Sequence, residues 1–311
     1  MGAVHDLIEV RGAKLARESA DADRAAVEAA IRFMGDEDSD AAFIYSGWAQ
    51  SALPHKRLAD DADWVLKTDH VTLLVEPGKR IGADGTPVPI GVPFGSRARL
   101  ILIYLQSEAL RTGRREIELG GSLREWLGRM GISSGGKSIR EVREQAERIA
   151  RCRMSFHISR GGRVGLVNQS IVDSTMFVEA EESGRQGSLF AEIAKLSEGF
   201  YEQLRKHPVP VQEAAIRAIS NNSAALDVYV WLAYRLHSLS APKPITWRAL
   251  YAQLGTGFSR LDNFRKKFRE SLALATAVYP EARVEEDGHG LILYPSRPPV
   301  APRLIAAPKR G

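Results

Sequence analysis

The chain has 311 residues, of which 44% are hydrophobic and 26% charged, a composition typical of soluble globular proteins and long enough for about two domains. A single cysteine, Cys152, excludes an intramolecular disulfide and a zinc site built on cysteines. No apolar run approaches the ~20 residues of a membrane span and the N-terminus lacks an apolar signal core, so we expect a cytoplasmic protein.

The net charge of +5 is unevenly distributed along the chain. Residues 1–40 contain five Lys or Arg and ten Asp or Glu, a balance of −5, so the other 271 residues carry +10. A basic body with an acidic N-terminal segment favours a polyanionic partner.

The N-terminal part predicts one helix and then a pair of strands. Apolar residues at helical spacing predict a single amphipathic helix over residues 5–34. After an irregular stretch, residues 64–78 predict two strands. The segment that follows, 77–95, is dense in Gly and Pro, which is typical of turns.

The next segment predicts three helices, a short strand and a hairpin. These elements are expected at 96–113 (helix), 115–119 (strand), 122–131 (helix), 139–152 (helix), and 153–159 with 164–172 (hairpin). Ser122 is expected to cap the second helix and Gly131 to end it.

The same order recurs after a polar segment, 179–188, that we interpret as a linker. Helices are expected over 221–239, 244–255 and 259–277, followed by a hairpin over 282–296. Equivalent residues match at an offset of 127 in the first helix, 124 in the second and 122 in the third, as loop deletions would produce. We therefore interpret the two segments as copies of one design; two unrelated helical segments with a common rhythm are the alternative.

Residues 131–138, GISSGGKS, match the P-loop pattern G-x-x-x-x-G-K-[ST]. A working P-loop follows a buried strand, whereas these glycines follow apolar residues at helical spacing. The equivalent turn of the second segment, 255–261, lacks the Lys–Ser ending. We interpret the match as a turn between helices, which leaves an NTPase that uses Lys137 and Ser138 as the least favoured hypothesis.

Helix, tight turn, helix and hairpin is the order of a winged helix-turn-helix, in which the second helix of the pair enters the major groove of DNA. We therefore predict an α+β fold with two tandem winged helix-turn-helix domains and an N-terminal helical arm. The predicted divisions are an acidic N-terminal helical arm (1–44), a first winged-helix domain (45–178), a linker with a connecting strand or helix (179–211), a second winged-helix domain (212–296) and a basic Pro-rich flexible tail (297–311).

The third helix of each copy carries an apolar stripe and, opposite it, cationic and polar residues that can donate to bases or phosphates. A merely solvated face is the alternative. Glu141 and Glu144 have the chemistry to accept from cytosine, but we favour pairing with Arg148 within the helix. The predicted DNA-binding residues, including two at the first hairpin tip, are Lys137, Ser138, Arg140, Glu141, Arg148, Arg151, Arg160, Arg163, Ser259, Arg260, Asn263, Lys266, Lys267 and Arg269.

Motifs of catalysis and metal binding are missing from the sequence. The seven histidines are scattered without HxxxH spacing, and no G-x-S-x-G elbow is present. We therefore expect no catalytic residues, no metal and no cofactor, and a protein that is not an enzyme.

Several long segments resemble the plasmid-encoded RepA replication initiators, over about residues 45–300. They are ALPHKR (52–57), VTLLVEPG (71–78), PVPIGVPFGSRARLILIYLQSEALRTG (87–113), GGKSIREVREQAERIARCR (135–153), AISNNSAALDVYVWLAYRLH (218–237) and AVYPEARVE (277–285). The resemblance implies a plasmid initiator that binds iterons at the origin through two winged-helix domains, helps to open DNA, and recruits the host initiator and replicative helicase.

The resemblance further implies a monomer–dimer equilibrium, repression of the protein's own promoter, and association with plasmid and nucleoid in a bacterial cytoplasm. It suggests no nucleotide site at GISSGGKS. A dimeric transcriptional repressor with the same fold, bound to a palindromic operator, is the alternative function.

Overall fold

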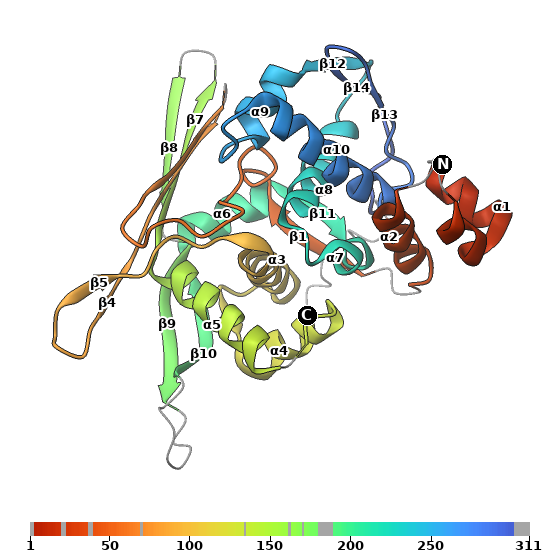
Figure 1. Ribbon diagram of the computed structural model, residues 1–311. Coiled ribbons are helices and arrows are strands. Elements are labelled where there is room, and N and C mark those ends of the chain that lie inside the picture. Colours follow the sequence, from red (N-terminus) through yellow and green to blue (C-terminus); the bar gives the residue numbers. More distant parts are fainter. Residues whose placement is uncertain are drawn as a thin grey trace. The chain divides into compact units, whose positions relative to one another are not determined.

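The computed structural model describes residues 3–19, 23–36, 40–68, 71–133, 135–160, 163–169, 171–179 and 189–301, and the chain forms two compact units (Figure 1). Residues 53–208 form one unit, here called the central unit. Residues 1–52 and 209–311 together form the other, here called the discontinuous unit. This division differs from the predicted one, which made residues 1–44 a separate arm and placed a linker at 179–211.

The central unit contains the first winged helix. Its elements are β2 (Trp64–Lys67), β3 (Val71–Glu76), β4 (Lys79–Ile81), β5 (Pro87–Pro89), α3 (Gly95–Thr112), β6 (Glu116–Glu118), α4 (Gly120–Arg129), α5 (Gly136–Arg151), β7 (Arg153–Arg160), β8 (Arg163–Gln169), β9 (Val172–Glu179), β10 (Leu189–Leu196) and α6 (Glu198–Lys206). Helix α3 is buried continuously from Ala98 to Ser107, which explains why its sequence is apolar on almost every side. Helix α4 begins at Gly120, so the prediction that Ser122 caps it was wrong.

The sheet of the first winged helix has the order β6-β10-β9, with both neighbouring pairs antiparallel. The predicted hairpin after α5 forms as β7–β8, but it belongs to a separate four-stranded sheet of order β2-β3-β7-β8. The wing is therefore the β9–β10 pair, and the prediction that the wing follows α5 directly was wrong. Residues 179–188, interpreted above as a linker, begin at the last residue of β9, and 180–188 lie outside the described residues.

The discontinuous unit contains the second winged helix. Its elements are α1 (Ala3–Glu18), α2 (Arg24–Met34), β1 (Ala41–Tyr45), β11 (Pro208–Gln212), α7 (Glu213–Ile219), α8 (Ser223–Leu236), β12 (Lys243–Thr246), α9 (Trp247–Leu254), α10 (Leu261–Ala277), β13 (Val284–Glu286) and β14 (Gly290–Leu293). Its sheet has the order β12-β14-β13, which places the first strand beside the last, as in the first winged helix. The predicted α+β fold with two tandem winged helices is confirmed.

The N-terminal segment is part of the discontinuous unit rather than a free arm. The predicted single helix is broken twice. Helix α1 is kinked at Gly12, whose φ is 77°. Asp23 then caps α2 by accepting hydrogen bonds from the amides of Ala25 and Ala26. His5 of α1 is buried, with its Nε2 atom 2.9 Å from the carbonyl oxygen of Ala277 at the end of α10. Apolar packing of α2 and these contacts hold the acidic segment in place.

Across the described residues, none of the helices has both the length and the hydropathy that a membrane span needs.

Candidate nucleic-acid interface

The turn between α4 and α5 contains the P-loop-like residues 131–138. Gly131 has φ of 74°, which favours glycine, and its amide donates to Gly128 at the end of α4. Gly135 is the N-cap of α5 and supplies no side chain to cap it. Lys137 and Ser138 lie in the first turn of α5, and the element before the turn is the helix α4, as the sequence predicts.

The N-terminal half of α5 presents two exposed cations of the first winged helix. Lys137 and Arg140 are exposed and form no ion pair with other described residues. Glu141, in contrast, lies 3.6 Å from Arg97 of α3, so its carboxylate is already paired and is poorly suited to accept from a base. These contacts place the side chains available to an anionic ligand near the start of the helix.

Arg148 is an internal residue, and its predicted place on the outer face of α5 was wrong. Its side chain is 3% exposed. It donates to the carbonyl oxygen of Val92 at 3.1 Å, to Asp60 at 3.2 Å and to Glu144 at 2.8 Å. Its guanidinium also lies 5.2 Å from the ring centroid of Phe94. The predicted intrahelical pair of Arg148 with Glu144 is confirmed, whereas that with Glu141 was wrong, because Glu141 pairs with Arg97 of α3. Arg148 fixes α5 to the segments before α3.

Arg151, at the end of α5, remains on the surface but is partly occupied. It pairs with Glu147 at 3.2 Å and donates to the carbonyl oxygen of Lys79 at 3.3 Å. Arg160 and Arg163 face each other across the β7–β8 hairpin, and their side chains lie outside the described residues. The expected role of both arginines as phosphate contacts assumed that this hairpin is the wing, which it is not. Their contact with DNA stays a prediction.

Aromatic residues hold α10, the third helix of the second winged helix, against α9. Phe264 and Phe268 are buried on its inner face. Phe264 packs edge-on against Tyr251 at 5.4 Å between ring centroids, and Phe268 packs edge-on against Trp247 at 5.9 Å. Such packing fixes the rotation of α10 about its axis and so decides which residues face solvent.

The outward face of α10 carries the predicted polar series. Its exposed members are Ser259, Arg260, Asn263, Lys266 and Lys267. Arg260 lies 3.4 Å from Asp262, and Lys267 lies 2.7 Å from Glu270. The side chains of Asn263 and Lys266 have no hydrogen bond or ion pair with other described residues. This face offers one amide and several cations to a ligand without any rearrangement of the core.

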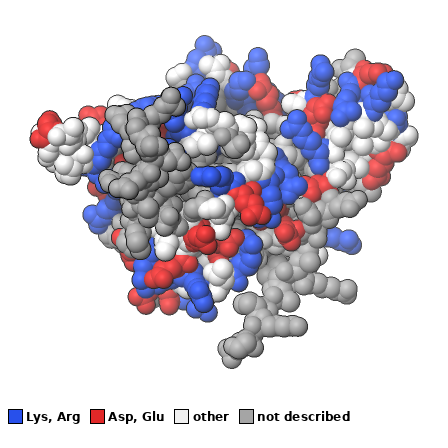
Figure 2. Space-filling model, turned by 90° about the horizontal axis from the view of Figure 1, so that it is seen from below, with Lys and Arg blue, Asp and Glu red and all other residues white. Residues whose placement is uncertain are grey.

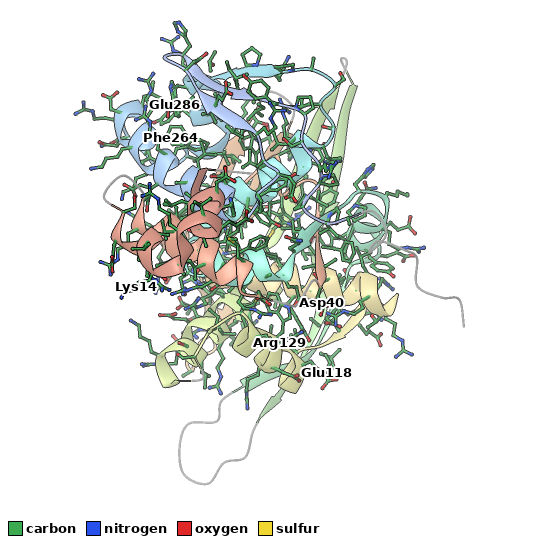
Figure 3. The ribbon with its side chains drawn as sticks, turned by 90° about the vertical axis from the view of Figure 1, so that its right-hand side faces the viewer. Lys14, Asp40, Glu118, Arg129, Phe264 and Glu286 are labelled. Carbon is green, nitrogen blue, oxygen red and sulfur yellow. The ribbon has the colours of Figure 1, made fainter. Side chains whose placement is uncertain are left out.

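Arg269, also predicted to bind DNA, is held by the wing. Its guanidinium makes a two-pronged contact with Glu286 of β13, the shortest distance being 2.6 Å. It also lies 5.2 Å from the ring centroid of Trp247. Figure 3 labels Glu286 and, on α10, Phe264. The pairing raises the pKa of Arg269 through the hydrogen bond from its side chain to Glu286 and ties the wing to the helix.

Sequence reasoning missed two exposed cations on the elements that precede α10. Lys243 of β12 and Arg248 of α9 are both exposed, and Arg248 follows the α9 cap, where Thr246 accepts from the amide of Ala249. Single cations in a four-residue strand or a two-turn helix give no periodic signal, so only the fold brings them to notice.

The wing itself differs from a basic wing. Its strand and turn contain three consecutive acids, Glu285, Glu286 and Asp287, and the Asp287 carboxylate accepts from the amides of His289 and Gly290. Positive charge therefore lies on α9 and α10 rather than on the wing strand. The face seen in Figure 2 likewise has blue and red side chains interspersed, so the molecule does not present one uniform basic surface there.

The arrangement is suited to binding an anionic polymer. In the described part of the chain, no three or more His, Cys, Asp or Glu side chains gather as metal ligands would. The one cysteine is buried, and burial raises the pKa of its thiol, which disfavours the reactive thiolate.

Comparisons with known proteins agree with this geometry. The family model described as "Plasmid encoded RepA protein" matches residues 92–248, about half of the chain, from just before α3 into α9. A crystal structure of selenomethionine derivatives of domains 2 and 3 of RctB aligns with a TM-score of 0.51 and 12% identity, covering 82% of this chain and 99% of that one.

A second crystal structure of RctB domains 2–3 has a TM-score of 0.47 and 10% identity, covering 79% of this chain and 94% of that one. The first alignment supports the fold and nothing more. A comparison with curated protein sequences gives no match.

Proposed function

The chain belongs to the family of plasmid-encoded RepA proteins, and from this premise we propose that it is a plasmid replication initiator that binds direct-repeat duplex DNA, the iterons, at an origin. The observation that carries the proposal is the pair of winged helices on one chain, each with a third helix whose exposed residues include cations. Two such helices on one chain suit an asymmetric site of about two helical turns, roughly 20 bp.

Within this proposal α10 is the main reader of sequence. Asn263 has the geometry of an amide that can bind adenine through two hydrogen bonds, while Lys266, Lys267, Arg260 and Arg248 supply charge for phosphates. Lys137 and Arg140 play the corresponding part on α5. Arg148 is left out, because its donors are used inside the protein.

The further roles implied by the family are part of the same proposal. They are assistance in opening the origin, recruitment of a host initiator and helicase, a monomer–dimer equilibrium and repression of the protein's own promoter. The proposal assigns no catalysis to the chain and treats residues 131–138 as a connection between helices. It therefore predicts no ATP hydrolysis above that of a heat-inactivated control.

Selection of bound duplexes from a random pool at physiological salt tests the proposal. A long asymmetric site of about two helical turns supports it, whereas a short palindrome would favour a dimeric repressor. Failure to enrich any site would overturn both.

Substitutions then separate base reading from charge. We expect Asn263→Ala to reduce the ratio of affinities for the selected and scrambled sites. Lys266→Ala should weaken binding to both and lower the slope of log affinity against log salt by about one. Lys14→Ala, on the exposed face of α1, is the matched control for the loss of one cation. An unchanged affinity ratio for Asn263→Ala would show that α10 does not read sequence through this residue.

A further inference from the structure

The β4–β5 hairpin is an exposed element that the proposed function does not use. It projects from the central unit (Figure 1), and all residues of β4 are exposed. Ile81 is 69% exposed and Val88 is 40% exposed. The hairpin pairs only with itself, as a two-stranded sheet. Such a hairpin is marginal in stability without a partner for its apolar side chains, so these exposed residues suggest a ligand.

The outer edge of the hairpin is protected against the addition of another strand. The amide of Gly82 donates to Thr86, and the amide of Ile90 donates to Gly78, so the hydrogen-bonded pairs fall at every second residue. Pro87 and Pro89 occupy the alternate positions, whose nitrogens face away from β4. The edge of β5 therefore lacks N–H donors at two of its three residues. A partner must be bound through side chains rather than through the backbone.

The base of the hairpin is fixed to the end of α5. The Arg151 guanidinium donates to the carbonyl oxygen of Lys79, and the backbone at Gly78 packs directly against Arg151. A Cβ atom at Gly78 would lie 2.2 Å from the carbonyl oxygen of Arg151, so only glycine allows this approach. The position of the hairpin is thus coupled to the helix that we propose for the major groove.

The residue order from base to tip suits a DNA groove. Lys79 and Arg80 lie in β4 near the base, and both are exposed. Ile81 follows them, and beyond it the turn is held by Asp84, which accepts from the amide and hydroxyl of Thr86. Proteins that bind the minor groove combine cations for its phosphate walls with apolar side chains, often Ile or Pro, that wedge against a base step.

We propose that the β4–β5 hairpin is a minor-groove arm, which places Lys79 and Arg80 on phosphates beside the site read by α5 and wedges Ile81, which shares a hairpin face with Pro87, against a base step to bend the duplex. The inference rests on the proposed function, because it requires the chain to bind duplex DNA. It adds a contact and a deformation of DNA to that function.

Two double variants test the arm on the full chain, with the selected site at the centre of an end-labelled duplex. Lys79→Ala with Arg80→Ala removes the two cations, and we expect it to lower the salt slope by about 1.8. Ile81→Ser with Val88→Ser removes the exposed apolar side chains of both hairpin faces, the wedge included, and we expect energy transfer between the labelled ends to show a smaller bend. Both variants should lose hydroxyl-radical protection on one flank of the site while keeping the preferred sequence.

The control is Val10→Ser, a valine of α1 that is 83% exposed and lies far along the chain from the hairpin. It should leave the bend, footprint and salt slope unchanged. If both double variants bind, bend and protect DNA as the wild type does, the inference is wrong. If they instead change only the sedimentation of the free protein, the hairpin contacts a second copy and the inference is also wrong.

The two proposals fail in different ways. A wild-type chain that enriches no duplex would overturn the proposed function itself. If the wild-type chain binds a specific site, but the hairpin substitutions leave the protection of its flanking DNA unchanged, only the proposal of the minor-groove arm would be overturned. Circular dichroism of each variant checks that the central unit is folded before either comparison.

Discussion

Replacement of Arg148 by alanine tests whether its buried side chain stabilises the central unit or contacts DNA. Its loss leaves the buried carbonyl oxygen of Val92 without its donor, which costs about 1–3 kcal/mol. Asp60 and Glu144 are 39% and 40% exposed, so they regain water and their lost ion pairs each cost at most about 1 kcal/mol. We expect the central unit to lose about 1–5 kcal/mol of unfolding free energy.

The measurement is native-state hydrogen exchange in urea, resolved by peptide, because a chain of two units need not unfold in one step. Arg151→Ala is the matched control, since it removes an exposed arginine from the same helix and should cost no more than about 1 kcal/mol. Equal losses of unfolding free energy in the two variants would refute this stabilising role of Arg148. So would an unchanged stability with a lower salt slope for DNA binding, the result expected of a phosphate contact.

Three further predictions concern other contacts. Asn222→Ala removes the cap of α8 and should cost about 0.5–2 kcal/mol in urea unfolding. Glu286→Gln releases Arg269, so DNA affinity by anisotropy should rise and the salt slope should steepen by about one; no change would mean that Arg269 stays away from phosphate. Although partial burial acts to raise it, hydrogen bonds led by the one from Arg57 lower the pKa of Asp60. The ionised Asp60 carboxylate therefore adds to the free energy of unfolding above its unfolded pKa, near 3.8, and this contribution is lost as pH falls through the folded pKa. Asp60→Asn should flatten that acid dependence of the unfolding free energy.

The winged helices were predictable because their signals are local. Helical spacing marks α3, α8 and α10, and the closing Gly131 has the positive φ that its place after α4 suggests. The N-terminal helix was predicted as one because its apolar spacing continues across the break. Asp23 caps α2, but it lies among other acidic residues, so the sequence does not distinguish it as a cap.

The remaining errors arise from contacts distant in sequence. Helical periodicity places Arg148 on the outer face of α5, but Asp60 and the segment around Phe94 cover that part of the helix. No local pattern near Arg148 predicts that a segment some 50 residues earlier in the chain covers this part of α5. Similarly, alternation predicts β7 and β8 as strands without indicating that their partner is β3 rather than β6. The site inherited both errors, because its expected wing and one of its expected cations depended on them.

The order in which the chain leaves the ribosome gives the two units different folding histories. The central unit is continuous, so every partner of its core has been synthesised once α6 emerges. The discontinuous unit needs α10 before α2 and His5 can find their places, which leaves the acidic N-terminal segment waiting through most of translation. The charge of −5 over residues 1–40 favours the solubility of that segment until the second winged helix is complete.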